Sequence, residues 1–313
     1  MAVNVPAAPE ARLRQARRIR RQQWGSVLWS AARTPRGMIG LGLAAFVVLV
    51  AVIGPFVAPN APDALVTLAF GKPSGQFLLG GDFLGRDVLS RVLDGGWVLL
   101  IMAACATVLG IAGGATAGVS AAYLRGASDG IIMRAADVIL SFPQIVFALL
   151  LLSLLGPRLW LITIAVGVSH APQVARVLRS ATLDISERDF VKAAELQGMR
   201  PAKVMWKEIL PNLVSPLMVE AGLRLTYSIV IIAGLAFLGF GPPPPAASWG
   251  TMINENRDGL SLSPWAVIVP ALLIALLTIG MNMFTDAFAR VAIGVDRQPE
   301  EAALIENLSP GSR

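Results

Sequence analysis

Long apolar stretches, separated by short groups of charged residues, dominate the pattern along this chain of 313 residues. Six intervals contain no charged side chain, and they cover residues 37–62, 95–124, 138–157, 159–175, 225–254 and 259–285. A helix needs about 20 residues to cross about 30 Å of hydrocarbon, so each interval has room for one crossing, the fourth only by extending past its uncharged part. The pattern therefore predicts an all-α membrane protein with six transmembrane helices.

The expected organisation of the chain follows from these intervals. A basic arm at 1–37 precedes a first transmembrane helix at 38–58, and an external segment follows at 59–96. The apolar core of that helix exceeds the 7–15 residues of a secretory signal, so we interpret it as a retained helix. The core at 97–290 adds five spans and a pair of inner helices, which we place at about 97–122, 131–155, 159–178, 188–210, 213–239 and 264–288. A tail at 291–313 completes the chain.

The composition agrees with a membrane protein, and the position of the charges explains the high isoelectric point. Hydrophobic residues make up 55% of the chain and charged residues only 15%, which argues against a soluble enzyme or a disordered scaffold. The net charge of +6 could suggest a nucleic-acid partner. However, residues 1–37 hold eight arginines and one acid, whereas the remainder carries 18 basic and 19 acidic groups. The basic character belongs to one arm, and we expect no nucleic-acid partner.

The distribution of basic residues between the loops predicts the orientation in the membrane, because cytoplasmic loops collect lysine and arginine. With the N-terminus inside, the inner segments hold 20 basic residues and the outer segments five. We therefore expect both termini in the cytoplasm.

Several kinds of chemistry are excluded by residue counts. The only cysteine, Cys105, cannot form an internal disulfide or a cysteine-based metal site, and the only histidine, His170, rules out an HExxH motif. No lysine lies in a phosphate-binding GxxxxGK[ST] loop, so the chain cannot hydrolyse a nucleotide by that route. These counts argue against a cysteine-based metal site, HExxH chemistry and a nucleotide-hydrolysing loop, and we expect no metal ligand.

The inner segment 176–211 is the most informative part of the sequence. Gly198 followed by Pro201 is typical of a helix that stops and a second that starts, since glycine permits a positive φ and proline favours the first helical turn. The first of these helices is expected to carry a face of small side chains with an aromatic at its edge, formed by Phe190, Ala193, Ala194 and Gly198.

This segment resembles the EAA loop of ABC importer permeases. The similar residues read DFVKAAELQG at 189–198 and continue to ILPN at 209–212. The stretches at 79–91 and 237–250, together with Asn282 and Asp286 in the last span, resemble the dipeptide, oligopeptide and nickel branch of that family. The likeness covers roughly residues 38–297.

The resemblance implies the transmembrane subunit of a type I ABC importer in the bacterial inner membrane. Such a subunit pairs with a homologous permease, binds two cytoplasmic ATPase subunits or domains, and receives substrate from an external binding protein. It has no catalytic residue and no cofactor of its own, because ATP and Mg are bound by the ATPases. The residues implied in ATPase coupling are Phe190, Lys192, Ala193, Ala194, Gly198, Pro211 and Asn212. Lys192 departs from the family, which usually has glutamate there, and inverts a charge at that interface.

Two features of the spans are candidates for the pathway or a gate. Glu220 and Arg224 lie four residues apart inside an otherwise uncharged region, where they either neutralise each other or line a pathway. Pro143 lies within the span expected at 131–155, where it should bend the helix.

Four further expectations concern packing. Asp137 is expected to pair with Arg134 or, alternatively, to contact substrate, and His170 is expected to bond to a neighbouring helix. Two overlapping GxxxG repeats in the second span favour packing within the subunit, with packing against a partner permease as the alternative. Three tryptophans close to predicted span edges are expected at the membrane interface: Trp97, Trp249 and Trp265.

The favoured function is a permease subunit for di- or oligopeptides in an ATP-driven importer. A permease of the same family for nickel or another small solute is the alternative within the family. A secondary transporter would need inverted repeats or interrupted helices with ionisable residues at the midplane, but no coupling face. An intramembrane enzyme would need a catalytic constellation, which the scattered ionisable residues do not suggest.

Overall fold

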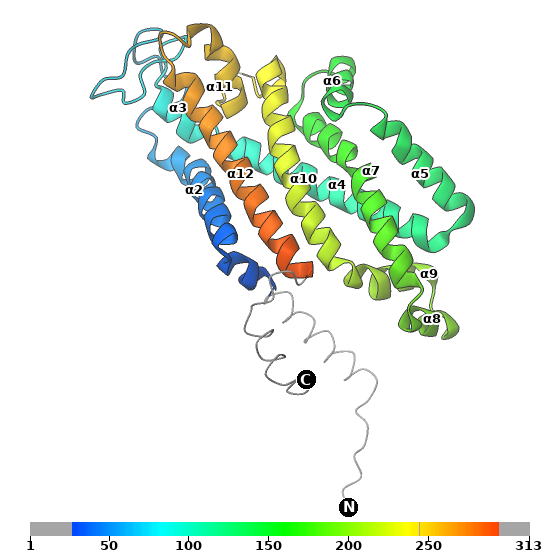
Figure 1. Ribbon diagram of the computed structural model, residues 1–313. Coiled ribbons are helices and arrows are strands. Elements are labelled where there is room, and N and C mark those ends of the chain that lie inside the picture. Colours follow the sequence, from blue (N-terminus) through cyan, green and yellow to red (C-terminus); the bar gives the residue numbers. More distant parts are fainter. Residues whose placement is uncertain (1–26, 244, 294–313) are drawn as a thin grey trace, which may run out of the picture.

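The computed structural model describes residues 27–243 and 245–293, and it is almost entirely helical in that part (Figure 1). The expectations placed on the arginine arm up to residue 26 and on the tail from 294 lie outside the described residues. Among the described residues, the β pairing consists of isolated bridges in the external segment, from Leu65 to Arg86 and from Gly81 to Asp87.

The described part contains five helical stretches long and apolar enough to cross a membrane, and a bent pair of helices that could form a sixth. The five are built from α2 (Pro35–Val57), α4 (Trp97–Leu124) preceded by the short α3 (Val88–Asp94), α7 (Leu159–Ser186), α10 (Val214–Leu235) continued by η3 (Ala236–Phe240), and α12 (Trp265–Ile293). The prediction of an all-α membrane fold is confirmed.

The bent pair corrects the expectation of one kinked helix over 131–155. Here α5 (Gly126–Leu140) and α6 (Gln144–Leu155) meet at an angle of 85°. Pro143 has φ −55° and ψ 133°, outside the helical region. Proline cannot donate a backbone hydrogen bond, and it disfavours helical geometry in the residue before it. Residues 141–143 are therefore not helical, and the chain turns there between α5 and α6.

Glycines bring α4 and α7 into close contact. A Cβ atom added at Gly114 would lie 2.5 Å from Val174 Cβ, and one at Gly118 would lie 2.4 Å from the carbonyl oxygen of Ala175. Gly110 lies in the same way against His170. Side chains at these positions would push the helices apart, and the prediction of glycine-mediated packing within the subunit is confirmed.

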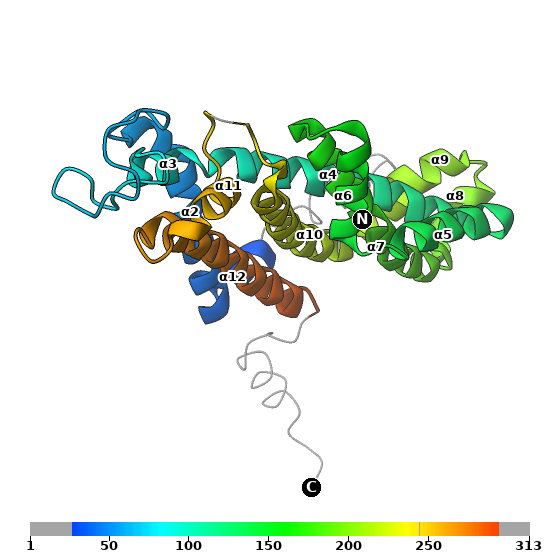
Figure 2. The ribbon, with the colours of Figure 1, turned by 90° about the horizontal axis from the view of Figure 1, so that it is seen from above.

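The helices α2 and α12 form a second close pair at one edge of the molecule (Figure 2). Gly40 and Gly280 make the contact, because a Cβ added at either would lie 2.7 Å from the carbonyl oxygen of the other. The other side of α2 exposes apolar side chains, among them Phe46, Leu49 and Ile53. Such a surface is suited to lipid, which offers no partners for polar groups.

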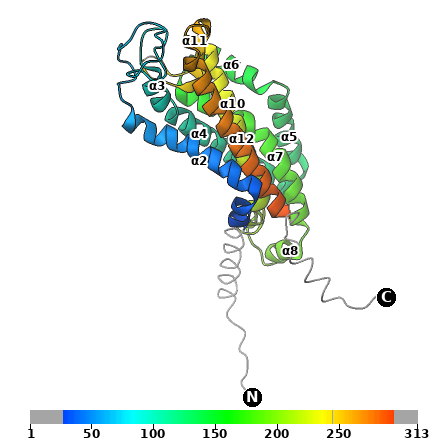
Figure 3. The same ribbon diagram turned by 60° about the vertical axis from the view of Figure 1, so that its left-hand side comes forward.

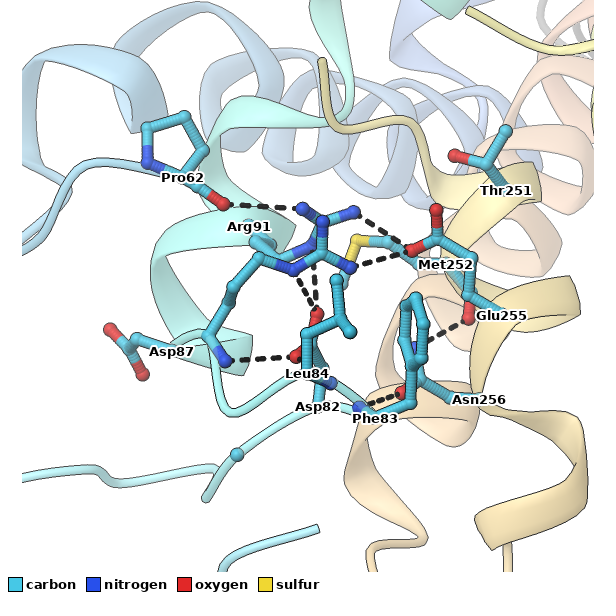
Figure 4. Close-up of polar contacts among 12 residues, drawn as sticks. Pro62, Asp82, Phe83, Leu84, Asp87, Arg91, Thr251, Met252, Glu255 and Asn256 are labelled. Atoms are coloured by element: carbon cyan, nitrogen blue, oxygen red, sulfur yellow. Dashed lines mark hydrogen bonds and ion pairs between the residues drawn. The ribbon is translucent and has the colours of Figure 1, made fainter. Parts of the chain in front are cut away.

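At the end of the bundle opposite α8 (Asp189–Leu196), the segment predicted to be external is joined to the short helix α11 (Trp249–Asn256) by buried charges (Figures 1 and 4). Arg86 and Arg91 each form ion pairs with both Asp82 and Glu255, at distances of 2.6, 3.0, 3.4 and 3.0 Å. We call these four residues the outer ion cluster. Asp82 and Arg91 are completely buried, so charge compensation is required for this segment to pack.

The expectation that Trp249 lies at the membrane interface is wrong. Its side chain is completely buried, and its indole N–H donates a hydrogen bond of 2.8 Å to the carbonyl oxygen of Val92. The indole packs against Gly95 and Gly96, where it stabilises the contact between α11 and the start of α4. Proximity to a span edge did not reveal that α11 packs against the start of α4 at this position.

Candidate coupling surface and membrane polar cluster

The inner helix pair lies beyond the end of α7, away from the outer ion cluster (Figures 1 and 3). The helix α8 (Asp189–Leu196) is followed by Gly198, which has φ +76°, and by α9, which begins at Pro201 (Pro201–Val204). Gly198 N–H donates to Glu195 and Met199 N–H to Ala194, the bonding pattern of a glycine C-cap. A Cβ added at Gly198 would meet no atom, so the positive φ explains the glycine here, and close packing does not.

The structure corrects the expected face of small residues on α8. Phe190, Ala193 and Gly198 are exposed, but Ala194 is only 6% exposed. Together with Val191 it packs into an inner apolar core that also contains Leu178 of α7 and Val204 of α9. Ala194 therefore anchors the helix to its own chain, because α8 must bury one apolar stripe to stay folded.

Leu196 is the apolar residue that sequence reasoning missed on this surface. It ends α8 and is 90% exposed, whereas Phe190 is 38% exposed. Single exposed leucines are common on protein surfaces, so the position of Leu196 at the end of the predicted coupling helix is what makes it a candidate contact. A leucine two residues before the glycine stop, within a polar segment, was the available signal. We call Phe190, Lys192, Ala193, Leu196 and Gly198 the coupling surface.

Lys192 has a partner within its own chain. Its Nζ lies 3.5 Å from Glu187 Oε2, and Glu187 also accepts a hydrogen bond from Arg125 at the corner between α4 and α5. The hydrogen bond and charge of Arg125, assisted by Lys192, lower the pKa of the Glu187 carboxyl below its usual value. All three side chains are more than half exposed, so this pairing is electrostatically weak.

Pro211 and Asn212 lie apart from the exposed tip. They belong to η2 (Leu210–Asn212), which follows the π-turn η1 (Met205–Ile209) and leads into α10. Both are half-buried, and the Asn212 side chain donates a hydrogen bond to the carbonyl oxygen of Glu208. The structure thus places these two predicted residues where the inner helices join the membrane bundle.

In the membrane bundle, Glu220 and Arg224 pair with each other, as the first of the two alternatives expected for them predicts. Arg224 Nε lies 3.1 Å from Glu220 Oε2, and the two residues are 8% and 6% exposed. The alignment of these two atoms does not satisfy a hydrogen bond, and neither has another hydrogen-bond partner. The pair is therefore neutral overall while its polar atoms are incompletely bonded.

Two glutamines extend this pair to other helices. Gln173 of α7 accepts hydrogen bonds from the Arg224 guanidinium and, at 3.1 Å, from the side-chain amide of Gln144. Gln144 is the first residue of α6, directly after the break at Pro143. We call Gln144, Gln173, Glu220 and Arg224 the Gln–Arg cluster. Sequence reasoning weighed only charges in the spans and passed over glutamines inside uncharged intervals.

The hydrogen bond predicted for His170 is confirmed. The His170 Nε2 atom lies 3.0 Å from Ser228 Oγ on α10, and Ser228 lies 3.2 Å from Thr107 on α4. All three residues are buried. These bonds tie α4, α7 and α10 together beside the Gln–Arg cluster.

The expected local pair of Asp137 with Arg134 is wrong. Asp137 pairs with Arg176 of α7. In addition, Asp129 forms a bidentate ion pair with Arg179 of α7, with both contacts at 2.6 Å. Both partners lie on the helix that packs beside α5, which spacing along α5 could not reveal. Ala136 is the one buried residue of α5, so this helix packs loosely against α7, and its solvent-accessible ion pairs add little to that packing.

Comparison with known proteins identifies related sequences. The family described as binding-protein-dependent transport system inner membrane component matches residues 114–292. The N-terminal transmembrane domain of oligopeptide transport permease C matches residues 22–73.

Individual relatives cover most of the chain. A putative peptide transport system permease protein of Brucella suis is 36% identical over 254 residues, which are 81% of this chain and 86% of the relative. The di/tripeptide transport system permease protein DppC of Pseudomonas aeruginosa is 34% identical over 266 residues, 82% of this chain and 88% of the relative.

Among solved structures, the MetNI methionine ABC transporter in an inward-facing conformation has a similar fold. The TM-score is 0.51 at 19% identity, over 67% of this chain and 97% of the matched chain. At that identity the match supports the fold alone.

Proposed function

This chain belongs to the family of binding-protein-dependent transport system inner membrane components, and we propose that it conducts di- or oligopeptides as the permease subunit of an ATP-driven importer. The part of this proposal that concerns coupling to the ATPases rests on the packing and exposure of α8. Its base packs into the inner core through Val191 and Ala194, while Leu196 at its tip is 90% exposed. A rigidly seated helix with an apolar tip can transmit a push from an ATPase to α7 and α10.

The proposed assembly contains a second, homologous permease, two ATPase subunits or domains and an external binding protein. The family description names dependence on a binding protein, and the relatives are named as peptide permeases. The chain itself supplies the path and the mechanical link, while the ATPases bind ATP and Mg. Nickel or another small solute is the alternative substrate within the family.

We place the chain in the bacterial inner membrane with both termini in the cytoplasm. The support is the excess of basic residues in the inner segments, 20 against five. In this orientation the coupling surface faces the cytoplasm and the outer ion cluster faces the external binding protein.

The test of transport uses the complex purified from its native membrane through a tag on this chain. It is reconstituted in liposomes with the binding protein outside, and uptake of radiolabelled Ala-Ala is measured with ATP inside or absent. We expect uptake only with ATP. Uptake driven by an ion gradient without ATP would contradict the proposal and favour a secondary transporter, and uptake of nickel alone would change the substrate.

The coupling surface is tested at Leu196. A charge in place of an interfacial leucine should prevent docking, so Leu196→Asp should abolish co-purification of the ATPase and uptake, with insertion unchanged. Leu196→Met keeps the apolar tip and should retain both. Normal uptake by Leu196→Asp would show that the ATPase docks elsewhere.

A further inference from the structure

We propose that the Gln–Arg cluster is a transient binding site in the translocation pathway for zwitterionic peptides, with Arg224 receiving the carboxylate terminus and Glu220 the ammonium terminus. This inference rests on the proposed function and adds a site to it. The glutamines supply and accept hydrogen bonds for the peptide amide between the two termini.

The cluster lies at the middle of the bundle. Arg224 is the eleventh of the 27 residues of the span formed by α10 and η3, and Gln173 is the fifteenth of the 28 residues of α7. Ionisable groups at such depth occur where they face protein or a water-filled path, and there they mark substrate routes. In the described part of the chain, the cluster is also where the broken span meets α7 and α10.

The side of the cluster next to the break is open. Gln144 and Gln173 are half-buried, Tyr227 is 50% exposed and Phe142 is 44% exposed. The Arg224 guanidinium lies 5.2 Å from the centre of the Tyr227 ring, so one exposed side chain leads directly to the buried charge. Part of the cluster is therefore accessible at the surface of this chain, beside Tyr227.

The backbone adds to the attraction for a carboxylate. The helix α6 begins at Gln144 with no side-chain cap, so its first N–H groups present a partial positive charge beside that glutamine. Interrupted helices of transporters direct such ends at anionic substrate groups near the midplane. Here Gln144, the first residue of α6, and the Arg224 guanidinium both donate to the side-chain oxygen of Gln173.

The incomplete bonding of the ion pair explains why a zwitterion is the fitting ligand. Arg224 Nε and Glu220 Oε2 balance each other in charge, yet neither has a hydrogen bond. A carboxylate can make two parallel bonds to a guanidinium, and an ammonium can bond to the freed glutamate. When the two peptide termini replace the contact between Glu220 and Arg224, each buried charge still has an opposite charge beside it. A ligand with one charged end would leave either Glu220 or Arg224 without an opposite charge.

The experiment compares Ala-Ala with Ala-Ala-amide in the reconstituted complex at saturating loaded binding protein. Under saturation the preference of the binding protein affects KM, and the maximal rate reports later steps. We expect the wild type to transport the free peptide about tenfold faster than the amide, a ratio typical of one lost charge-assisted interaction. The double variant E220Q/R224Q should transport both at the slower rate, with KM unchanged.

A matched control and a binding measurement complete the test. Thr163 is buried and bonds only within α7, so Thr163→Val should keep the tenfold preference. In a Cys105→Ala background, the free peptide should slow maleimide labelling of Tyr227→Cys more than the amide does. This measurement does not depend on folding of the double variant.

Three results would overturn the site: equal maximal rates for both peptides in the wild type, a preserved preference in E220Q/R224Q, or equal protection of Tyr227→Cys by both peptides. Absence of any peptide uptake by the wild type would instead contradict the proposed function.

Discussion

The outer ion cluster and the Gln–Arg cluster are both buried groups of opposite charges, but they are bonded differently. In the outer cluster two arginines share two carboxylates through four ion pairs. Arg91 Nε, 3.4 Å from Asp82 Oδ2, has no hydrogen bond there, but the other three pairs are hydrogen-bonded. Asp82 is further held by the backbone N–H groups of Leu84 and Arg86, at 2.9 and 2.8 Å. In the membrane, one arginine faces one glutamate without a hydrogen bond between Nε and Oε2.

The difference separates a fixed clamp from an exchangeable pair. Oxygen atoms that accept backbone N–H groups cannot move without unfolding the loop, so the outer cluster holds the external segment on α11. Glu220 and Arg224 lie on one helix and depend on side chains of other helices, Gln144 and Gln173, which can move with them. Buried charges thus serve rigidity in one place and, in our proposal, substrate passage in the other.

Removal of a charge from the clamp should have the largest effect. Arg91→Met leaves Asp82 and Glu255 with one arginine between them, and breaking a buried pair costs about 3–5 kcal/mol. We expect a large fall in the melting temperature of the purified protein in detergent. Arg257→Met, at an exposed position in the same region, should change it little. Equal melting of the two variants would remove the distinction between clamp and surface pair.

Removal of Arg224 should destabilise less and impair transport more. Arg224→Met leaves Glu220 unpaired, but that carboxyl can take up a proton, so we expect a loss of about 1–3 kcal/mol. The double variant E220Q/R224Q should recover most of the stability, as measured by thermal unfolding, while peptide transport stays slow. A stability loss as large as that of Arg91→Met, unrelieved in the double variant, would make this pair a second clamp.

The exposed pairing of Glu187 with Arg125 and Lys192 should have the smallest effect. Because the folded pKa of Glu187 is lowered, its stabilising contribution is present above the ordinary carboxyl value of 4.5 and is lost as the pH falls through the folded value. Glu187→Gln should lower the melting temperature by about 1 °C or less at pH 7, and by less as the pH falls through the lowered pKa of Glu187. A larger difference, or one that grows in acid, would mean that the carboxylate is not the stabilising form.

Much of the fold could be predicted because its signals are local. The uncharged intervals locate the spans, since length and apolarity decide whether a helix can cross a bilayer. The glycines at 110, 114 and 118 recur on one helical face, and they pack against α7. The break at Gly198 and Pro201 follows from backbone preferences of single residues.

The candidate sites were predicted less completely because they depend on which helix faces which. Ala194 was expected on an exposed face, and tertiary packing turned it inward. Asp137 forms its ion pair with Arg176 of α7, and not with the neighbouring Arg134 of its own helix. Gln173 belongs to the Gln–Arg cluster because it accepts hydrogen bonds from Gln144 of α6 and Arg224 of α10, which the sequence of α7 does not show.

The sequence by itself determined the helical membrane architecture, the location of the inner helix pair and the family resemblance, because hydropathy, glycine and proline act over a few residues. Tertiary structure alone decided that Arg91 meets Glu255 and that Arg224 meets Gln173. Those partners are 164 and 51 residues apart along the chain. A buried charge is stable only beside its partner, and the packing of distant helices decides which partner that is.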